Sequence, residues 1–200
     1  MAAAVRGRRI AAILIFPLLI AGCGAAQGPP AGTTTVAEIK AGGEHNDTDV
    51  MFLQMLIFHQ RQGLDMAGTA AERATGPELK NLIKAVRATE QNELTIMQSW
   101  LGDWGEPTDV DAAPSAHTGH GGLHGTNPAD ITRLQTVDAA QFDATFLNMF
   151  LAHQHNAIEL AQMEIESGAN PRAKEFAERV RQTRHGEIRQ MLRLTTGDHQ

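Results

Sequence analysis

The chain has 200 residues, a formal net charge of -6 and a single cysteine, Cys23. An acidic chain is poorly suited to the phosphate backbone of nucleic acids, so we expect no nucleic-acid partner. One cysteine excludes a disulfide within the chain.

The first 22 residues have the pattern of a secretory signal. Arginines precede an apolar run at residues 10–20, which is too short to span a bilayer, and small residues follow it. Leu19-Ile20-Ala21-Gly22-Cys23 resembles a bacterial lipobox. This resemblance implies cleavage before Cys23, a diacylglycerol on its sulfur with palmitate among the acyl groups of the lipid, and anchoring to the extracytoplasmic face of the cell membrane. The alternative is a secretory signal with an incidental cysteine.

Residues 23–44 are rich in Gly, Ala, Thr and Pro, which predicts a flexible tether. The folded part is therefore expected at residues 45–196. No other apolar run in the sequence is long enough to cross a membrane.

The folded part contains an internal repeat. Between Asp49 and Met97, 15 of 49 positions are identical to the position 94 residues further on, several times what chance produces. Copy one is expected at residues 45–101, a linker at 102–137 and copy two at 138–195.

Cap and break signals divide each copy into two long helices. The first helix is expected to begin near Asn46 and end near Ala74, and Pro77 opens a second helix that ends near Gly102. Copy two repeats the pattern from a cap at Asp138 to an end near residue 195, and the linker predicts a short helix at 127–134. Neither antiparallel hairpin can bury its apolar face alone. We therefore expect the two hairpins to pack together as an all-α four-helix bundle.

Methionine and histidine lie on one face of the predicted helices, because members of each pair are four residues apart. Pseudosymmetric packing would bring these residues together near the bundle axis. Thioether sulfur and neutral imidazole suit Cu(I) better than Mg or Ca, and histidine also accepts Cu(II), Zn and Ni. Glu93 and Glu187 are expected to orient the imidazoles as hydrogen-bond acceptors. The candidate metal ligands are Met55, His59, Met97, Met149, His153 and Met191.

The same pattern has a second interpretation. Methionine at helical spacing commonly fills a core, and a buried histidine is commonly a hydrogen-bonded packing residue. Both interpretations fit a motif that is retained in two copies.

Three histidines in the Gly-rich linker, His117, His120 and His124, are a separate candidate for weak capture of Cu(II), Zn or Ni. The alternative is a polar linker that contains histidine incidentally. His155 and His185 have no histidine counterpart in the other copy, so we expect them on the surface.

No catalytic motif is present in the sequence. No histidine follows a glutamate at the spacing of a di-metal carboxylate site, and the nucleophile-elbow, zinc-protease, phosphate-loop and dinucleotide patterns are missing. We therefore expect a protein that is not an enzyme and that has no organic cofactor.

The segments around Met55 and Met149 resemble the domain of unknown function 305 (DUF305) family of bacterial envelope proteins. Glu93-Leu94 with Met97, and Glu187-Ile188 with Met191, fit a later element of its motif. The resemblance covers about residues 45–195 and implies a ferritin-like four-helix bundle and metal handling, copper especially. The remaining matches are Phe52, His59, Leu64, Asp65, Met66 and Ala67 in copy one, and Phe146, His153, Ala157, Ile158, Glu159 and Ala161 in copy two.

The sequence departs from this motif where a second histidine is expected, because Gln60 and Gln154 stand there. Glutamine is a poor ligand for soft metals. We therefore hold two main hypotheses, a lipid-anchored copper buffer or chaperone and a non-metal interaction module of the envelope. A metal-dependent redox enzyme is a weaker alternative.

Overall fold

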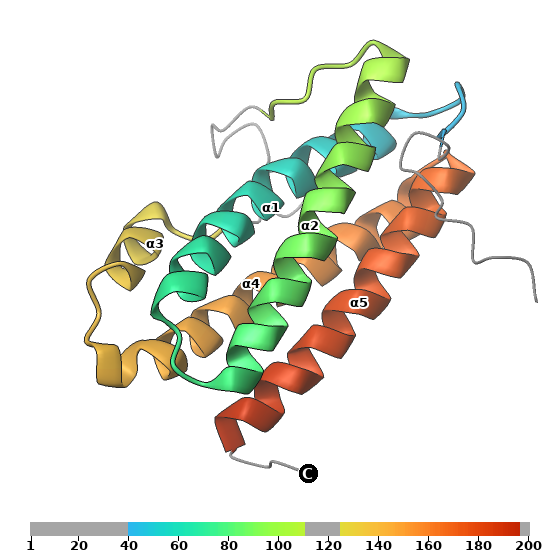
Figure 1. Cartoon of the computed structure of the whole chain (residues 1–200). Coiled ribbons are helices and arrows are strands. Elements are labelled where there is room, and N and C mark those ends of the chain that lie inside the picture. The colour runs from blue at the N-terminus through green and yellow to red at the C-terminus, as the bar shows by residue number, and fades with distance from the viewer. Residues whose placement is uncertain (1–39, 111–124, 197–200) are drawn as a thin grey trace, which may run out of the picture. The chain divides into compact units, whose positions relative to one another are not determined.

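The structure is a computed structural model that describes residues 40–110 and 125–196. The predicted signal peptide, Cys23, most of the predicted tether and the three linker histidines lie outside these ranges. The described residues form helices α1 (Asp47–Arg73), α2 (Pro77–Trp104), α3 (Pro128–Leu134), α4 (Ala139–Ser167) and α5 (Pro171–Thr196) (Figure 1). They include no strand, and the predicted all-α fold is confirmed. None of these helices is long and apolar enough to cross a membrane.

Local signals explain where the helices begin and end. A capping box opens α1, in which the Asn46 side chain accepts from the Asp49 amide and the Asp49 carboxylate accepts from the Asn46 amide. Helix α2 begins at Pro77, whose missing N–H costs nothing in a first turn. It continues past its predicted end at Gly102 and stops at Gly105, which has a φ of 77°.

The four long helices pack as two antiparallel hairpins, α1–α2 and α4–α5 (Figure 1). Helix α1 lies against α4, whereas α2 and α5 pack less closely than the other neighbouring pairs of long helices. The apolar core falls into two clusters along the bundle. The first cluster contains Met55, Met97 and Trp100, and the second contains Met66 and Met191.

Each hairpin turn is capped by an aspartate of the other hairpin. Asp49 of α1 accepts hydrogen bonds from the backbone amides of Ala169 and Asn170, between α4 and α5. The residue 94 positions later, Asp143 of α4, accepts from the amides of Thr75 and Gly76, between α1 and α2. The two contacts are equivalent in the repeat, so they join the copies at both ends of the bundle.

Replacement of Asp143 by alanine should lower the free energy of unfolding by about 2 kcal/mol, because three turn donors lose a charged acceptor. Asp138→Ala is the matched control. Asp138 precedes the same helix, but its side chain makes no capping hydrogen bond. Urea unfolding of both variants tests this, and equal stabilities would contradict it.

Residues 40–45 correct the predicted boundary of the tether. Ala41 is buried, and the Asn170 side chain donates to the carbonyl oxygens of Ala41 and Glu44. The Trp104 indole donates to the carbonyl of Gly42 and its ring stacks on His45 at 4.3 Å between centroids. The folded part therefore begins before residue 45, because these backbone carbonyls have partners on the bundle.

Candidate functional site: a buried polar layer

Eight polar side chains lie across the middle of the bundle, and we call them the polar layer. Each long helix contributes two of them, at positions between its contributions to the two apolar clusters. Every member is buried. Burial of polar groups is costly unless they are paired, so their contacts decide what the layer does. The members are His59, Gln60, Glu90, Glu93, His153, Gln154, Arg184 and Glu187.

The two histidines of the repeat meet at the centre of this layer. The rings of His59 and His153 stack with centroids 3.6 Å apart and planes 11° from parallel. His59 Nε2 lies 2.9 Å from the carbonyl oxygen of His153. A carbonyl only accepts, so this nitrogen of His59 carries a proton.

The linker reaches the layer through Thr126. The Thr126 hydroxyl lies 2.9 Å from His153 Nδ1, and the amide of Gln62 holds the Thr126 backbone through both its oxygen and its nitrogen. Burial lowers the pKa of His153 well below its usual value, and the neighbouring His59 and Arg184 lower it further. His153 is therefore neutral near pH 7, and one of its two ring nitrogens has a lone pair.

The two glutamines bond to glutamates in equivalent positions of the repeat. Gln60 donates to Glu93 at 2.5 Å, and Gln154 donates to Glu187 at 2.9 Å. The amides thereby give each carboxylate a fixed position. A side chain that looked like a lost metal ligand in the sequence has a structural partner here.

Glu90 and Arg184 break the symmetry of the layer, since they occupy equivalent positions with opposite charge. The Arg184 guanidinium lies 2.5 Å from Glu93 and 3.6 Å from both Glu90 and Glu187. Burial alone would lower the pKa of Arg184, but these three carboxylates raise it, so the guanidinium stays charged. Burial raises the pKa values of Glu90 and Glu187 to about 7, against the opposing effect of Arg184.

Gly63 of α1 allows two unsatisfied atoms of the layer to approach the helix backbone closely. His153 Nε2 and Glu90 Oε2 are buried and have no hydrogen-bond partner. A Cβ atom on Gly63 would lie 2.7 Å from the first and 2.8 Å from the second. Both atoms therefore pack against α1 at Gly63, where any larger residue would clash with them. Imidazole nitrogen and carboxylate oxygen are both donor types that a borderline metal ion accepts.

The structure brings the predicted imidazoles together but divides the predicted thioethers. Met55 and Met97 lie in the first apolar cluster, while Met191 lies in the second, against which the half-buried Met149 packs. In the described ranges, no three His, Asp or Glu side chains form a ready-made metal cage.

Glu93 and Glu187, predicted to orient the imidazoles, accept from the two glutamines instead. His155 and His185 are exposed, as predicted.

Glu90, Arg184 and Thr126 were not expected in the site. For Glu90 and Arg184, the repeat offers a clue in the sequence. They occupy equivalent positions of the two copies but have opposite charges. Thr126 is a polar residue in a loop, and no pattern in the sequence distinguishes it from its neighbours.

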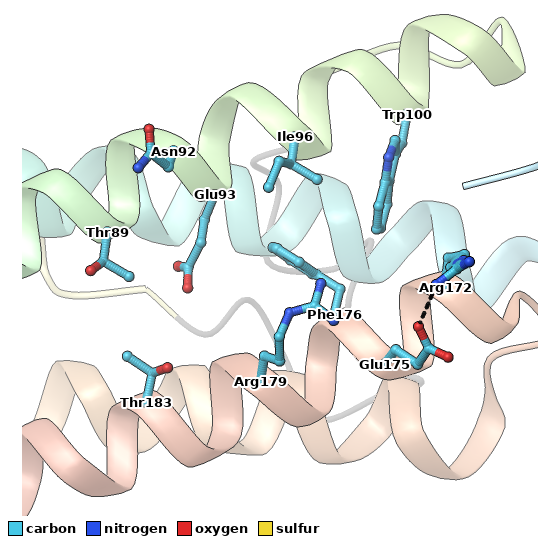
Figure 2. A pocket seen from close by; sticks show the side chains of 10 residues that line it. All are labelled: Thr89, Asn92, Glu93, Ile96, Trp100, Arg172, Glu175, Phe176, Arg179 and Thr183. Atoms are coloured by element: carbon cyan, nitrogen blue, oxygen red, sulfur yellow. Dashed lines mark hydrogen bonds and ion pairs between the residues drawn. The ribbon is translucent and has the colours of Figure 1, made fainter. Parts of the chain in front are cut away.

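A cleft of 470 Å³ between α2 and α5 leads to the polar layer (Figure 2). Trp100, Ile96 and Phe176 give it apolar walls, and Arg172 at its rim pairs with Glu175 at 3.0 Å. Glu93 points into the cleft (Figure 2). Its carboxylate also contacts Arg184 of the layer. The layer therefore has one member that lines a surface cleft.

The fold and its layer define a class of all-α bundles built from two repeated helix hairpins with buried histidines at their centre. The chain belongs to the family described as Domain of unknown function (DUF305), whose profile matches residues 49–195. A comparison with curated proteins finds no significant match.

Solved structures share this fold. A DUF305 fragment from Deinococcus radiodurans is 23% identical, with a TM-score of 0.66 over 74% of this chain and 95% of that one. A DUF305 protein from Streptomyces coelicolor is 24% identical, with a TM-score of 0.67 over 74% and 91%. CopM in its Cu(I)-bound form is 21% identical, with a TM-score of 0.64 over 78% and 100%.

Proposed function

We propose that this chain is a lipid-anchored envelope protein that binds copper as a buffer or chaperone. The observation that carries the proposal is the stacked, buried pair of rings of His59 and His153. His153 Nε2 in this pair and Glu90 Oε2 beside it have no hydrogen-bond partner. A neutral imidazole is a ligand for copper in either common oxidation state. The shared fold of CopM, solved with Cu(I), Cu(II) and Ag, supports the same metal class.

The thioethers would extend this site toward Cu(I). Met55 and Met97 lie in the apolar cluster on one side of the layer, and Met191 lies in the cluster on the other side. Sulfur ligands favour Cu(I), so the proposal requires these flexible side chains to move toward the imidazoles when the ion binds. The expected anchor at Cys23 would keep the protein at the membrane, and the linker histidines His117, His120 and His124 would capture ions before transfer.

Anaerobic titration with Cu(I) against a competing chelator tests this proposal. We expect binding tighter than about micromolar, and we expect His59→Ala with His153→Ala to weaken it at least about tenfold. His155→Ala with His185→Ala is the control, since both side chains are exposed and lie outside the layer. Binding weaker than micromolar in the unaltered chain would exclude a buffer or chaperone.

The cleft between α2 and α5 favours the second candidate, an interaction module that uses no metal. Its mixture of aromatic walls and charged rim is typical of a surface that another protein contacts. In that case Arg179→Glu in the cleft should abolish function in cells, whereas Met55→Leu with Met149→Leu should leave it intact. The opposite result would favour the metal.

A further inference from the structure

We infer that a groove between α1 and α2 binds an acidic, extended segment of another protein, and we call it the basic groove. It consists of two hollows, of about 300 and 330 Å³, which share Arg87 as a lining residue. The groove lies outside the polar layer and needs no metal, so its ligand is independent of the copper site proposed above. The lining residues are Leu64, Ala71, Lys80, Ile83, Lys84, Arg87, Ala88 and Gln91.

Three cations lie along one face of α2, because residues three or four apart are neighbours on the surface of a helix. Lys80, Lys84 and Arg87 are all exposed. Lys80 also interacts with the Asp143 carboxylate, whereas Lys84 and Arg87 form no ion pair within the described ranges. Every acidic residue of α2 between positions 80 and 102 is buried. The groove therefore has positive charge that its surroundings leave uncompensated, in a chain whose net charge is -6.

The α1 side of the groove has little side-chain bulk. Leu64 and Ala71 line it, and Gly68 shares their face of the helix. A Cβ on Gly68 would meet no atom within 4 Å, so the space above this residue is open. In copy two, the larger residues Gln162 and Ile165 occupy the positions equivalent to Gly68 and Ala71. The open space beside the cations is therefore a property of copy one.

The charges of the groove also differ between the copies. Glu178 occupies the position equivalent to Lys84, and it pairs at 2.9 Å with Arg181, the equivalent of Arg87. The remaining lysine of this face, Lys174, donates to a backbone carbonyl oxygen. Copy two thus satisfies its own cations, and only copy one offers them to a partner.

The dimensions of the groove select the kind of partner. The stretch of α2 from Lys80 to Gln91 rises about 16 Å, which about five residues of extended chain would span. Carboxylates on alternate residues of such a segment would reach the cations from within the groove. Screening confines these attractions to roughly 8 Å in physiological salt, so a short acidic segment is bound locally although the whole chain is acidic.

A membrane surface fits the groove less well than an extended chain does. Stable binding to an anionic bilayer takes a cluster of about four to eight cations or an inserted apolar face. The groove has three cations, and in residues 40–110 and 125–196 the exposed large apolar side chain is Leu192, which belongs to α5. A concave site also keeps part of its lining away from a flat surface.

Fluorescence anisotropy of a fluorescein-labelled hexaglutamate peptide, with the full metal-free chain, tests the inference. We expect a dissociation constant of about 10–100 µM at about 50 mM salt, and no binding of labelled hexaserine. Lys84→Glu should weaken hexaglutamate binding at least about tenfold, because the new carboxylate would pair with Arg87 as Glu178 pairs with Arg181. Arg189→Glu, at an exposed position of α5, is the control with the same change of charge and should bind as the unaltered chain does.

Gly68→Gln tests the shape of the groove without changing its charge. It introduces the residue of copy two and should weaken hexaglutamate binding at least about threefold, while circular dichroism still shows a folded protein. Equal binding by the unaltered chain and Lys84→Glu would overturn the inference, and so would the absence of hexaglutamate binding. Vesicles of phosphatidylglycerol that bind the unaltered chain more tightly than hexaglutamate does, and lose this binding in Lys84→Glu, would overturn it in favour of a membrane. None of these results changes the Cu(I) titration, so the two proposals stand or fall separately.

Discussion

Replacement of Arg184 by methionine should destabilise the protein by about 3–5 kcal/mol near neutral pH, the largest effect we expect from a single change. The guanidinium is fully buried and is the cation nearest to three buried carboxyl groups. Without it, those groups keep the cost of burial and repel one another. The loss should become smaller as the pH falls, because protonation makes the carboxyl groups neutral.

Arg181→Met, one turn earlier on α5, is the matched control. Arg181 pairs with Glu178 at 2.9 Å, but both side chains are more than a third exposed. Exposed pairs contribute little, so this variant should lose less than about 1 kcal/mol. Urea unfolding of both variants at several pH values measures the difference. Equal losses would show that the buried carboxyl groups do not depend on Arg184.

Stability should also fall as the pH rises, because of a buried carboxyl group at the far end of α4. Burial raises the pKa of Glu164 to about 9, helped by its hydrogen bond to Asp49 and the charge of that residue, and opposed by Lys174. The unfolded chain has the ordinary pKa of 4.5. Between these pKa values the folded protein holds a proton that the unfolded chain releases. Each pH unit of increase therefore lowers the free energy of unfolding by up to about 1.4 kcal/mol.

Glu164→Gln should flatten this dependence, because glutamine is neutral and its amide still donates to Asp49. From about pH 6 to about pH 8, the unaltered chain should lose about 2 kcal/mol more stability than the variant does. Glu166→Gln, an exposed neighbour on α4, should keep the original slope. Urea unfolding across this range gives the comparison, and parallel curves for all three proteins would rule out a neutral Glu164.

Most of the fold could be predicted because the residues that start and end its helices act locally and occur in both copies of the repeat. Pro77 and Pro171 each open a helix after a short turn, and Gly168 ends α4. A polar cap at Asn46 fixes the start of α1 for the same reason. The docking of residues 40–45 could not be predicted, because it depends on carbonyl groups that every residue has and on a distant acceptor of the bundle, Asn170.

The site was predictable only in part. Spacing along a helix indicated that His59 and His153 share faces that would meet, and the rings do stack. Spacing does not reveal how far apart the helices lie along the bundle, so it did not show that the methionines fall into separate apolar clusters. Spacing also does not show which buried side-chain amide donates a hydrogen bond to a carboxylate, as Gln60 does to Glu93.

The opposite charges at Glu90 and Arg184 have a consequence for how such a protein can be assembled. A bundle of two hairpins has the arrangement of a twofold dimer, and in a dimer of identical chains equivalent positions carry the same residue. Glutamate would then face glutamate across the axis, or arginine would face arginine. Because the two hairpins belong to one chain, the repeat positions can differ, and one side supplies the cation that the other needs. Fusion into a single polypeptide is therefore a chemical requirement of this core, and two identical half-length chains could not reproduce it.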